Sequence, residues 1–123
     1  LRGQERRSAQ DEHEKSGKRI MAYLIFIISV AFAAKIAEAI ISGQSNGEAL
    51  NQLIPDHYHG WAGILAVVLM GCLWYLGRKT SSLRKEGESI VKTRDLHGRL
   101  GDVMAVLVVV HAFLGFLYLL QII

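Results

Sequence analysis

The sequence predicts an all-α integral membrane protein with three transmembrane helices. About half of its 123 residues (51%) are hydrophobic, and they concentrate in three long runs, residues 20–41, 59–77 and 98–121. A helix of about 20 apolar residues matches the hydrocarbon thickness of a bilayer, because each residue adds about 1.5 Å. Polar segments separate the three runs, so a single soluble core is not expected.

The positive charges predict how the helices are oriented. Residues 1–19 carry six Lys or Arg. The polar loop predicted over residues 78–96 carries another six, whereas the polar loop predicted over residues 42–58 carries none. By the positive-inside rule, the N-terminus is inside and the C-terminus outside. We therefore expect a polar cytoplasmic arm (residues 1–19) and a transmembrane domain (residues 20–123). The expected location is a bacterial inner membrane or an equivalent energy-transducing membrane, with lipid as a partner and no role for nucleic acid.

An expected ion pair lies near the far end of the first run, and an expected short helix follows it. Lys35 and Glu38 are three residues apart and so share a helix face. The simpler interpretation is an ion pair extending into the membrane interface; the alternative is a contact of Lys35 with an anionic cofactor group or another subunit. Further on, we expect a short amphipathic helix over residues 47–53, and we expect Pro55 and Asp56 to help start the next helix.

Histidines are the candidate ligands. His97 opens the third run and His111 lies fourteen residues further on, which is about four helical turns, so both point the same way about 21 Å apart. An ionisable side chain within a membrane span is costly and is usually retained for function. His59 opens the second run, and an antiparallel arrangement brings it near the depth of His111. Two neutral imidazoles on facing helices are suited to holding haem b from both sides.

Glycines accompany these histidines. Gly63 and Gly115 each follow a histidine by one turn, where the missing side chain would make room for a flat macrocycle. Arg99 is a candidate contact for a haem propionate, or alternatively a member of a surface ion pair. The segments HGWAG and HGRLG share the form His-Gly-x-x-Gly, so the second and third runs begin alike.

The role of His97 stays open at this stage. A second haem there would need a histidine from another copy or another subunit, because the first two runs offer none at that level. Otherwise His97 is an interfacial residue, bonded to Asp95 or to a quinone headgroup. The neighbouring His57 competes with His59 as a ligand.

Other chemistry is constrained by what the sequence contains. Cys72 is the single cysteine, so a disulfide within the chain and a cysteine-based zinc site are not expected. Met70 and Met104 are expected to pack rather than to coordinate iron. No Ser/His/Asp or paired-carboxylate arrangement appears, so no catalytic residues are expected. Two alternatives to haem remain: a chlorophyll-type pigment held by His111 alone, and a structural subunit without a cofactor.

The segments RDLHGRLG and VVVHAFLG resemble the ligand-bearing helix of membrane b-type cytochromes, including ferric-reductase-like and quinone-linked cytochrome b proteins. HAFLG is also similar to the haem-ligand helix of succinate dehydrogenase membrane anchors, which have three spans. The resemblance covers about thirty residues. It implies an electron-transfer subunit with one haem b, and a second as an option, whose ligands come from His59, His111 and His97. A haem between only three helices would leave an edge open to lipid, so we expect a homo-oligomer or other membrane subunits as partners, with quinone as a candidate.

Overall fold

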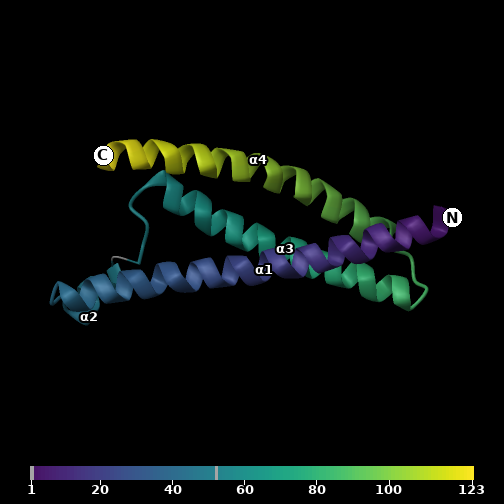
Figure 1. The fold of residues 1–123 in the computed structure, drawn as a ribbon, viewed down its shortest axis with the longest axis horizontal. Coiled ribbons are helices and arrows are strands. Elements are labelled where there is room, and N and C mark those ends of the chain that lie inside the picture. Colours follow the sequence, from purple (N-terminus) through teal and green to yellow (C-terminus); the bar gives the residue numbers. More distant parts are fainter. Residues whose placement is uncertain (1, 52) are drawn as a thin grey trace. The chain divides into compact units, whose positions relative to one another are not determined.

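The computed structural model describes residues 2–51 and 53–123, and within that range every regular element is a helix. The elements are α1 (Arg2–Ile41), α2 (Asn46–Asn51), α3 (Tyr58–Lys85) and α4 (Val91–Ile122), as Figure 1 shows. Three helices are long and apolar enough to cross a membrane: Arg2–Ile41, Tyr58–Lys85 and Val91–Gln121. The predicted all-α class with three membrane spans is confirmed.

The chain divides into two compact units, residues 1–55 and 56–123. In the first unit, α1 continues without a break from the charged segment into the apolar run. It ends where Gly43 adopts φ 68°, with the N–H of Gly43 donating to the Ile40 carbonyl (3.2 Å) and that of Gln44 to the Ala39 carbonyl (3.1 Å). This is a Schellman motif, for which a glycine with positive φ is suited. Near this end, Lys35 Nζ lies 3.1 Å from Glu38 Oε2, so the expected ion pair forms.

The short helix α2 begins with a capping box. Glu48 Oε2 accepts hydrogen bonds from the backbone N–H of Ser45 (2.9 Å) and from its hydroxyl (2.8 Å). The helix starts at Asn46 and ends at Asn51, so it begins one residue before the segment 47–53 expected from the sequence. Gln52, within that expected segment, lies outside the described residues.

The second unit is an antiparallel hairpin of α3 and α4. His57 caps α3, because its Nδ1 accepts a hydrogen bond from the backbone N–H of Gly60 at 2.9 Å. The capping side chain is therefore one residue later than Asp56, where the sequence had placed the start of the helix. An imidazole nitrogen without a proton is an acceptor and satisfies a first-turn N–H as a capping oxygen does.

The polar connection between α3 and α4 is shorter than expected. The sequence predicted a loop over residues 78–96, but α3 continues to Lys85 and α4 begins at Val91. Hydropathy marks where a helix leaves the lipid, whereas the backbone hydrogen bonds of the helix can continue through polar residues in water. The helix ends where Gly87 adopts φ 75° and the N–H of Glu88 donates to the Leu83 carbonyl (2.9 Å).

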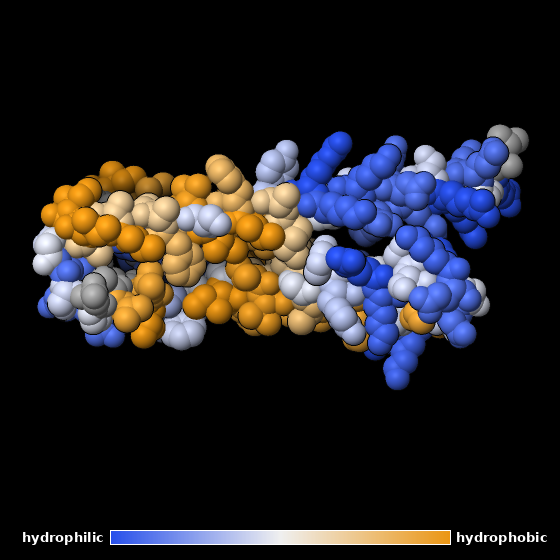
Figure 2. All heavy atoms as spheres, turned by 90° about the horizontal axis from the view of Figure 1, so that it is seen from below, coloured by the Kyte–Doolittle hydropathy of each residue, from blue (hydrophilic) through white to orange (hydrophobic). Residues whose placement is uncertain are grey.

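Most apolar side chains lie on the outside of the helices. Among the residues whose burial is described, only Ala39, Leu73, Thr80 and Met104 are buried. Large hydrophobic side chains such as Phe26, Val109 and Phe116 are more than half exposed, and Figure 2 shows an extensive hydrophobic surface beside a hydrophilic region. Such an exposed surface is far larger than soluble monomers present, and it suits a lipid environment.

The capping box of α2 predicts a lowered pKa for the Glu48 carboxyl. The two hydrogen bonds from Ser45 lower the pKa of the Glu48 carboxyl, because they stabilise its charged form. The capping box is therefore complete above the ordinary glutamate pKa and is lost as pH falls through the lowered value. We expect an NMR titration of the Glu48 carboxyl carbon to give a pKa below the ordinary glutamate value. The substitution S45A should move the Glu48 pKa back toward the ordinary value; an unchanged titration in S45A would contradict this capping box.

Candidate functional site

His59 and His111 meet between α3 and α4. Their rings are stacked, with centroids 4.1 Å apart and planes inclined by 18°. His59 belongs to the first turn of α3 and His111 to the middle of α4, so the antiparallel register brings together residues that are 52 positions apart. The structure thus places the two histidines side by side, as the sequence analysis expected.

The tautomer of His59 follows from its hydrogen bond. Its Nδ1 lies 3.2 Å from the backbone carbonyl oxygen of His111. A carbonyl oxygen only accepts, so Nδ1 of His59 carries the proton and Nε2 retains its lone pair. His57 has the opposite arrangement, because its Nδ1 accepts from Gly60 and the proton of the neutral ring must sit on Nε2.

Each ring of the pair packs against a glycine of the facing helix. A Cβ atom added to Gly115 on α4 would lie 2.8 Å from Cε1 of His59, and one added to Gly63 on α3 would lie 3.2 Å from Cε1 of His111. Any side chain at Gly115 would therefore force the His59 ring to move. The sequence predicts that each glycine leaves space beside the histidine of its own helix. In the structure, each glycine instead contacts the histidine ring of the other helix.

His97 makes the same kind of contact at the opposite end of the hairpin. Its Nδ1 lies 3.1 Å from the Leu73 carbonyl oxygen, and a Cβ on Gly77 would lie 3.4 Å from its Cε1. In both cases the carbonyl belongs to the residue four positions before the glycine. A histidine of one helix thus sits over a glycine of the other and donates to the carbonyl one turn earlier.

A shift of 38 residues relates the two ends of the hairpin. It superposes His59 on His97, Gly63 on Gly101 and Gly77 on Gly115. It also superposes Leu73 on His111, so the end that holds His97 has leucine where the other end has a second histidine. The similar segments HGWAG and HGRLG are the beginning of this longer repeat, which extends to Gly77 and Gly115. Following the shift through the whole of both helices would have found the partner glycine of His97.

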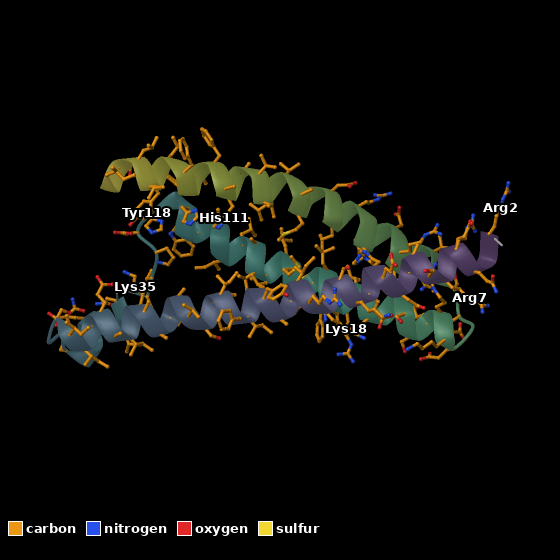
Figure 3. All side chains as sticks on the ribbon, viewed as in Figure 1. Arg2, Arg7, Lys18, Lys35, His111 and Tyr118 are labelled. Carbon is orange, nitrogen blue, oxygen red and sulfur yellow. The ribbon has the colours of Figure 1, made fainter. Side chains whose placement is uncertain are left out.

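Aromatic rings extend the histidine pair toward the start of α3. The ring of Tyr118 lies 4.3 Å from that of His57 and 6.4 Å from that of His59, nearly parallel to the latter at 8°. Figure 3 shows Tyr118 and His111 extending from α4 toward the start of α3. The sequence placed Tyr118 on the histidine face of its helix but did not identify its contact with His57.

Arg99 is not part of the histidine pair. Its Nε lies 3.1 Å from Oδ2 of Asp95, so it forms the surface ion pair that was one of its two expected roles. It also precedes His111 by twelve residues, which is about 18 Å along α4. Arg99 therefore does not contact the His59–His111 pair, and its role as a haem propionate contact stays a prediction.

Comparison with protein-family models, with curated proteins and with solved structures yields no match. Within residues 2–51 and 53–123, no group of three or more His, Cys, Asp or Glu side chains is arranged to hold a metal ion. The imidazole rings of this region are those of His59 and His111, with the His57 ring 6.0 Å from that of His59. Cys72 is a free, exposed thiol.

The histidine pair has features that suit a haem and one that requires movement. Nδ1 of His111 is buried without a hydrogen-bond partner, which is costly for a polar atom and is common where a ligand completes a site. The glycines opposite both rings provide space that side chains would otherwise fill. However, rings stacked at 4.1 Å leave no space for an iron atom between them, so they must separate before both can coordinate one.

The distances at the four glycines predict a graded series of alanine variants. Gly115→Ala should destabilise most (Cβ contact at 2.8 Å), followed by Gly63→Ala (3.2 Å), while Gly77→Ala (3.4 Å) should be close to neutral. Overpacking costs about 1–3 kcal/mol, which we expect for Gly115→Ala. Gly71→Ala is the control, because a Cβ there meets nothing within 4 Å and alanine favours helix by up to ~1 kcal/mol. The measurement is thermal unfolding in one detergent; a series without this order would contradict the packing described.

The hydrogen bonds predict three defined histidine tautomers. Nitrogen-15 NMR of the neutral rings should show a protonated Nδ1 in His59 and in His97, and a protonated Nε2 in His57. Most exposed neutral histidines favour the Nε2-protonated form in water, so the Nδ1 form reports the contact with a carbonyl. A short unstructured peptide that contains histidine serves as the reference. An Nε2-protonated His59 would contradict its bond to the His111 carbonyl.

Proposed function

We propose that this protein is a membrane electron-transfer subunit that binds one haem b between α3 and α4 through His59 and His111. The observation that carries the proposal is the meeting of two imidazoles from adjacent membrane-spanning helices, with a glycine facing each ring. The resemblance of the α4 sequence to membrane b-type cytochromes points the same way. Haem b, when bound, supplies one-electron chemistry.

The residues of the chain would perform three tasks at this site. The Nδ1–H bond from His59 to the His111 carbonyl selects the tautomer whose Nε2 can coordinate iron once the rings separate. The apolar side chains of both helices exclude water, which favours low-spin coordination by two neutral imidazoles and influences the redox potential. Gly63 and Gly115 keep space open beside the rings.

Separation of the rings is plausible on structural grounds, because His59 is near an end of its helix. It lies in the first turn of α3, one residue after Tyr58, where fewer backbone hydrogen bonds hold the chain than in mid-helix. His111 lies twenty residues into α4 and is held on both sides by helix. We therefore propose that His59 moves and His111 stays when the site is occupied.

The finer topology and the partners are also proposals. The distribution of Lys and Arg supports an N-terminus on the cytoplasmic side and a location in an energy-transducing membrane such as a bacterial inner membrane. A haem between two helices would remain exposed at its edges. We therefore propose that further subunits or other copies of the chain complete its enclosure, with quinone as a candidate redox partner.

A cofactor-free packing subunit is the second candidate, and one observation favours it. His97 makes the same glycine and carbonyl contacts as His59, although its facing residue is Leu73 rather than a second histidine. The contact thus forms where no second imidazole is available, so it can join two membrane helices without a cofactor. Interhelical hydrogen bonds and close approach at glycine are both used in this way.

Absorption spectra of the purified protein test the proposal. Oxidised and dithionite-reduced spectra in mild detergent should show low-spin haem b, at one haem per chain. H111L should abolish the bound haem because it removes the ligand, and H59L should do the same. The matched control H13L, on α1, should keep it, and H97L should also keep the haem if the site is the His59–His111 pair.

The outcomes separate the candidates. A colourless wild-type protein would support the packing subunit, and an extractable chlorophyll-type pigment would replace haem with a singly ligated magnesium. An unchanged low-spin spectrum in H111L would overturn the proposed ligand set.

A further inference from the structure

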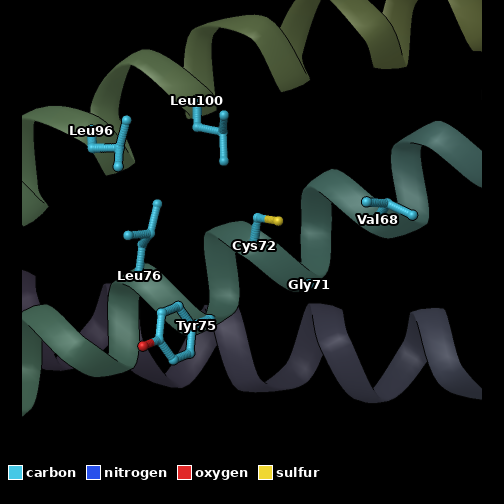
Figure 4. A pocket seen from close by; sticks show the side chains of 7 residues that line it. All are labelled: Val68, Gly71, Cys72, Tyr75, Leu76, Leu96 and Leu100. Carbon is cyan, nitrogen blue, oxygen red and sulfur yellow. The ribbon is translucent and has the colours of Figure 1, made fainter.

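A shallow apolar groove lies between the middle of α3 and the first third of α4. Its volume is about 490 Å³, and Gly71, Cys72, Leu76, Leu96 and Leu100 are among the residues that line it. Figure 4 shows Leu96 and Leu100 of α4 across the groove from Leu76 and Cys72 of α3. The groove lies outside the histidine pair and has no part in the function proposed above.

Small side chains open the groove. A Cβ added to Gly71 would meet nothing within 4 Å, and the neighbouring Cys72 is small and exposed. The 38-residue shift relates these two positions to Val109 and Val110 on α4, which carry larger side chains. The small pair therefore occurs on α3 but not at the matching positions of α4. On α3 it leaves apolar space facing the membrane.

Two lysines lie beyond the groove, toward the polar end of the hairpin. Lys79 follows Tyr75 by four residues and Cys72 by seven, so it lies on the same face of α3, about 10 Å beyond Cys72. Lys92 precedes Leu96 by four residues on α4. Both side chains are exposed, and in the described part of the chain neither ammonium has a carboxylate within ion-pair distance.

The acidic residues nearby do not neutralise these lysines. Asp95 is paired with Arg99 at 3.1 Å, and Glu86 Oε1 accepts a hydrogen bond from Ser82 at 2.7 Å. The groove therefore combines an apolar floor at membrane depth with uncompensated positive charge where the helices leave the membrane. An amphiphile with a long apolar tail and an anionic head has the complementary pattern.

We propose that this groove binds an anionic phospholipid, with an acyl chain against Gly71, Cys72 and Leu100 and the headgroup phosphate at Lys79 and Lys92. Basic residues beside a cleft between transmembrane helices are a common way to bind anionic headgroups, and the attraction is about 1 kcal/mol per basic residue near the surface. A zwitterionic lipid fills the floor equally well but lacks the net negative charge. The site therefore selects for the head and tolerates variation in the tail.

The single cysteine reports directly on the groove. Cys72 is its lining thiol and the only cysteine in the sequence, so labelling by N-ethylmaleimide follows one site in the unmodified chain. We expect severalfold slower labelling in vesicles of phosphatidylcholine with phosphatidylglycerol than in vesicles of phosphatidylcholine alone. The double variant K79Q/K92Q should lose this difference, while K15Q/K35Q, which removes the same charge from α1, should keep it.

Three results would overturn the proposal. Equal labelling rates in the two vesicles would mean that no anionic lipid covers the thiol. Equal slowing in wild type and K79Q/K92Q would mean that phosphatidylglycerol acts through the general surface potential. An unreactive Cys72 in delipidated detergent solution would mean that protein, from this chain or a second copy, fills the groove.

A second measurement does not depend on cysteine chemistry. Native mass spectrometry of the detergent-extracted protein with added phosphatidylglycerol should show one retained lipid per chain. Gly71→Leu should reduce this retention by filling the floor, and K79Q/K92Q should reduce it by removing the charges. Retention that is unchanged in both variants would also overturn the proposal.

Discussion

The contact of an imidazole with a glycine and a carbonyl sets the register of the membrane hairpin. A polar ring between two apolar helices is stable only if its N–H finds an acceptor, because lipid offers none. Backbone carbonyls in a helix already accept one bond but keep a second lone pair, and a glycine one turn further on lets the ring approach. His59 and His97 satisfy this requirement at opposite ends of α3 and α4. A slip of either helix by one residue would break both contacts together.

The remaining contacts between α3 and α4 follow from this register. Few described side chains are buried, so a conventional hydrophobic core does not hold the helices together. In a bilayer this is expected, since apolar side chains gain little by moving from lipid to protein. Close approach at small residues and interhelical hydrogen bonds then contribute most to association, and the hairpin uses both at its histidines.

The two ends of the hairpin use the same contact of a histidine with a glycine and a carbonyl, with one difference in sequence. The inverted repeat supplies the same histidine and glycine at each end, but only one end also has His111 in the place of Leu73. The added imidazole has a buried Nδ1 without a partner, a cost that packing alone does not require. That cost is the reason to favour a ligand at this end. Near the middle of α3, the smaller residues Gly71 and Cys72 leave a groove facing lipid.

The sequence alone determined the class, the three spans and the face on which the histidines lie, because hydropathy and helical periodicity are local properties. It also indicated the ion pair between Lys35 and Glu38, whose partners are one turn apart. Only the tertiary structure decided that Gly115 serves His59 and that Gly77 serves His97. These contacts depend on the relative displacement of two helices, which no single segment encodes. The same holds for the groove at Cys72, which exists only once α3 and α4 are packed together.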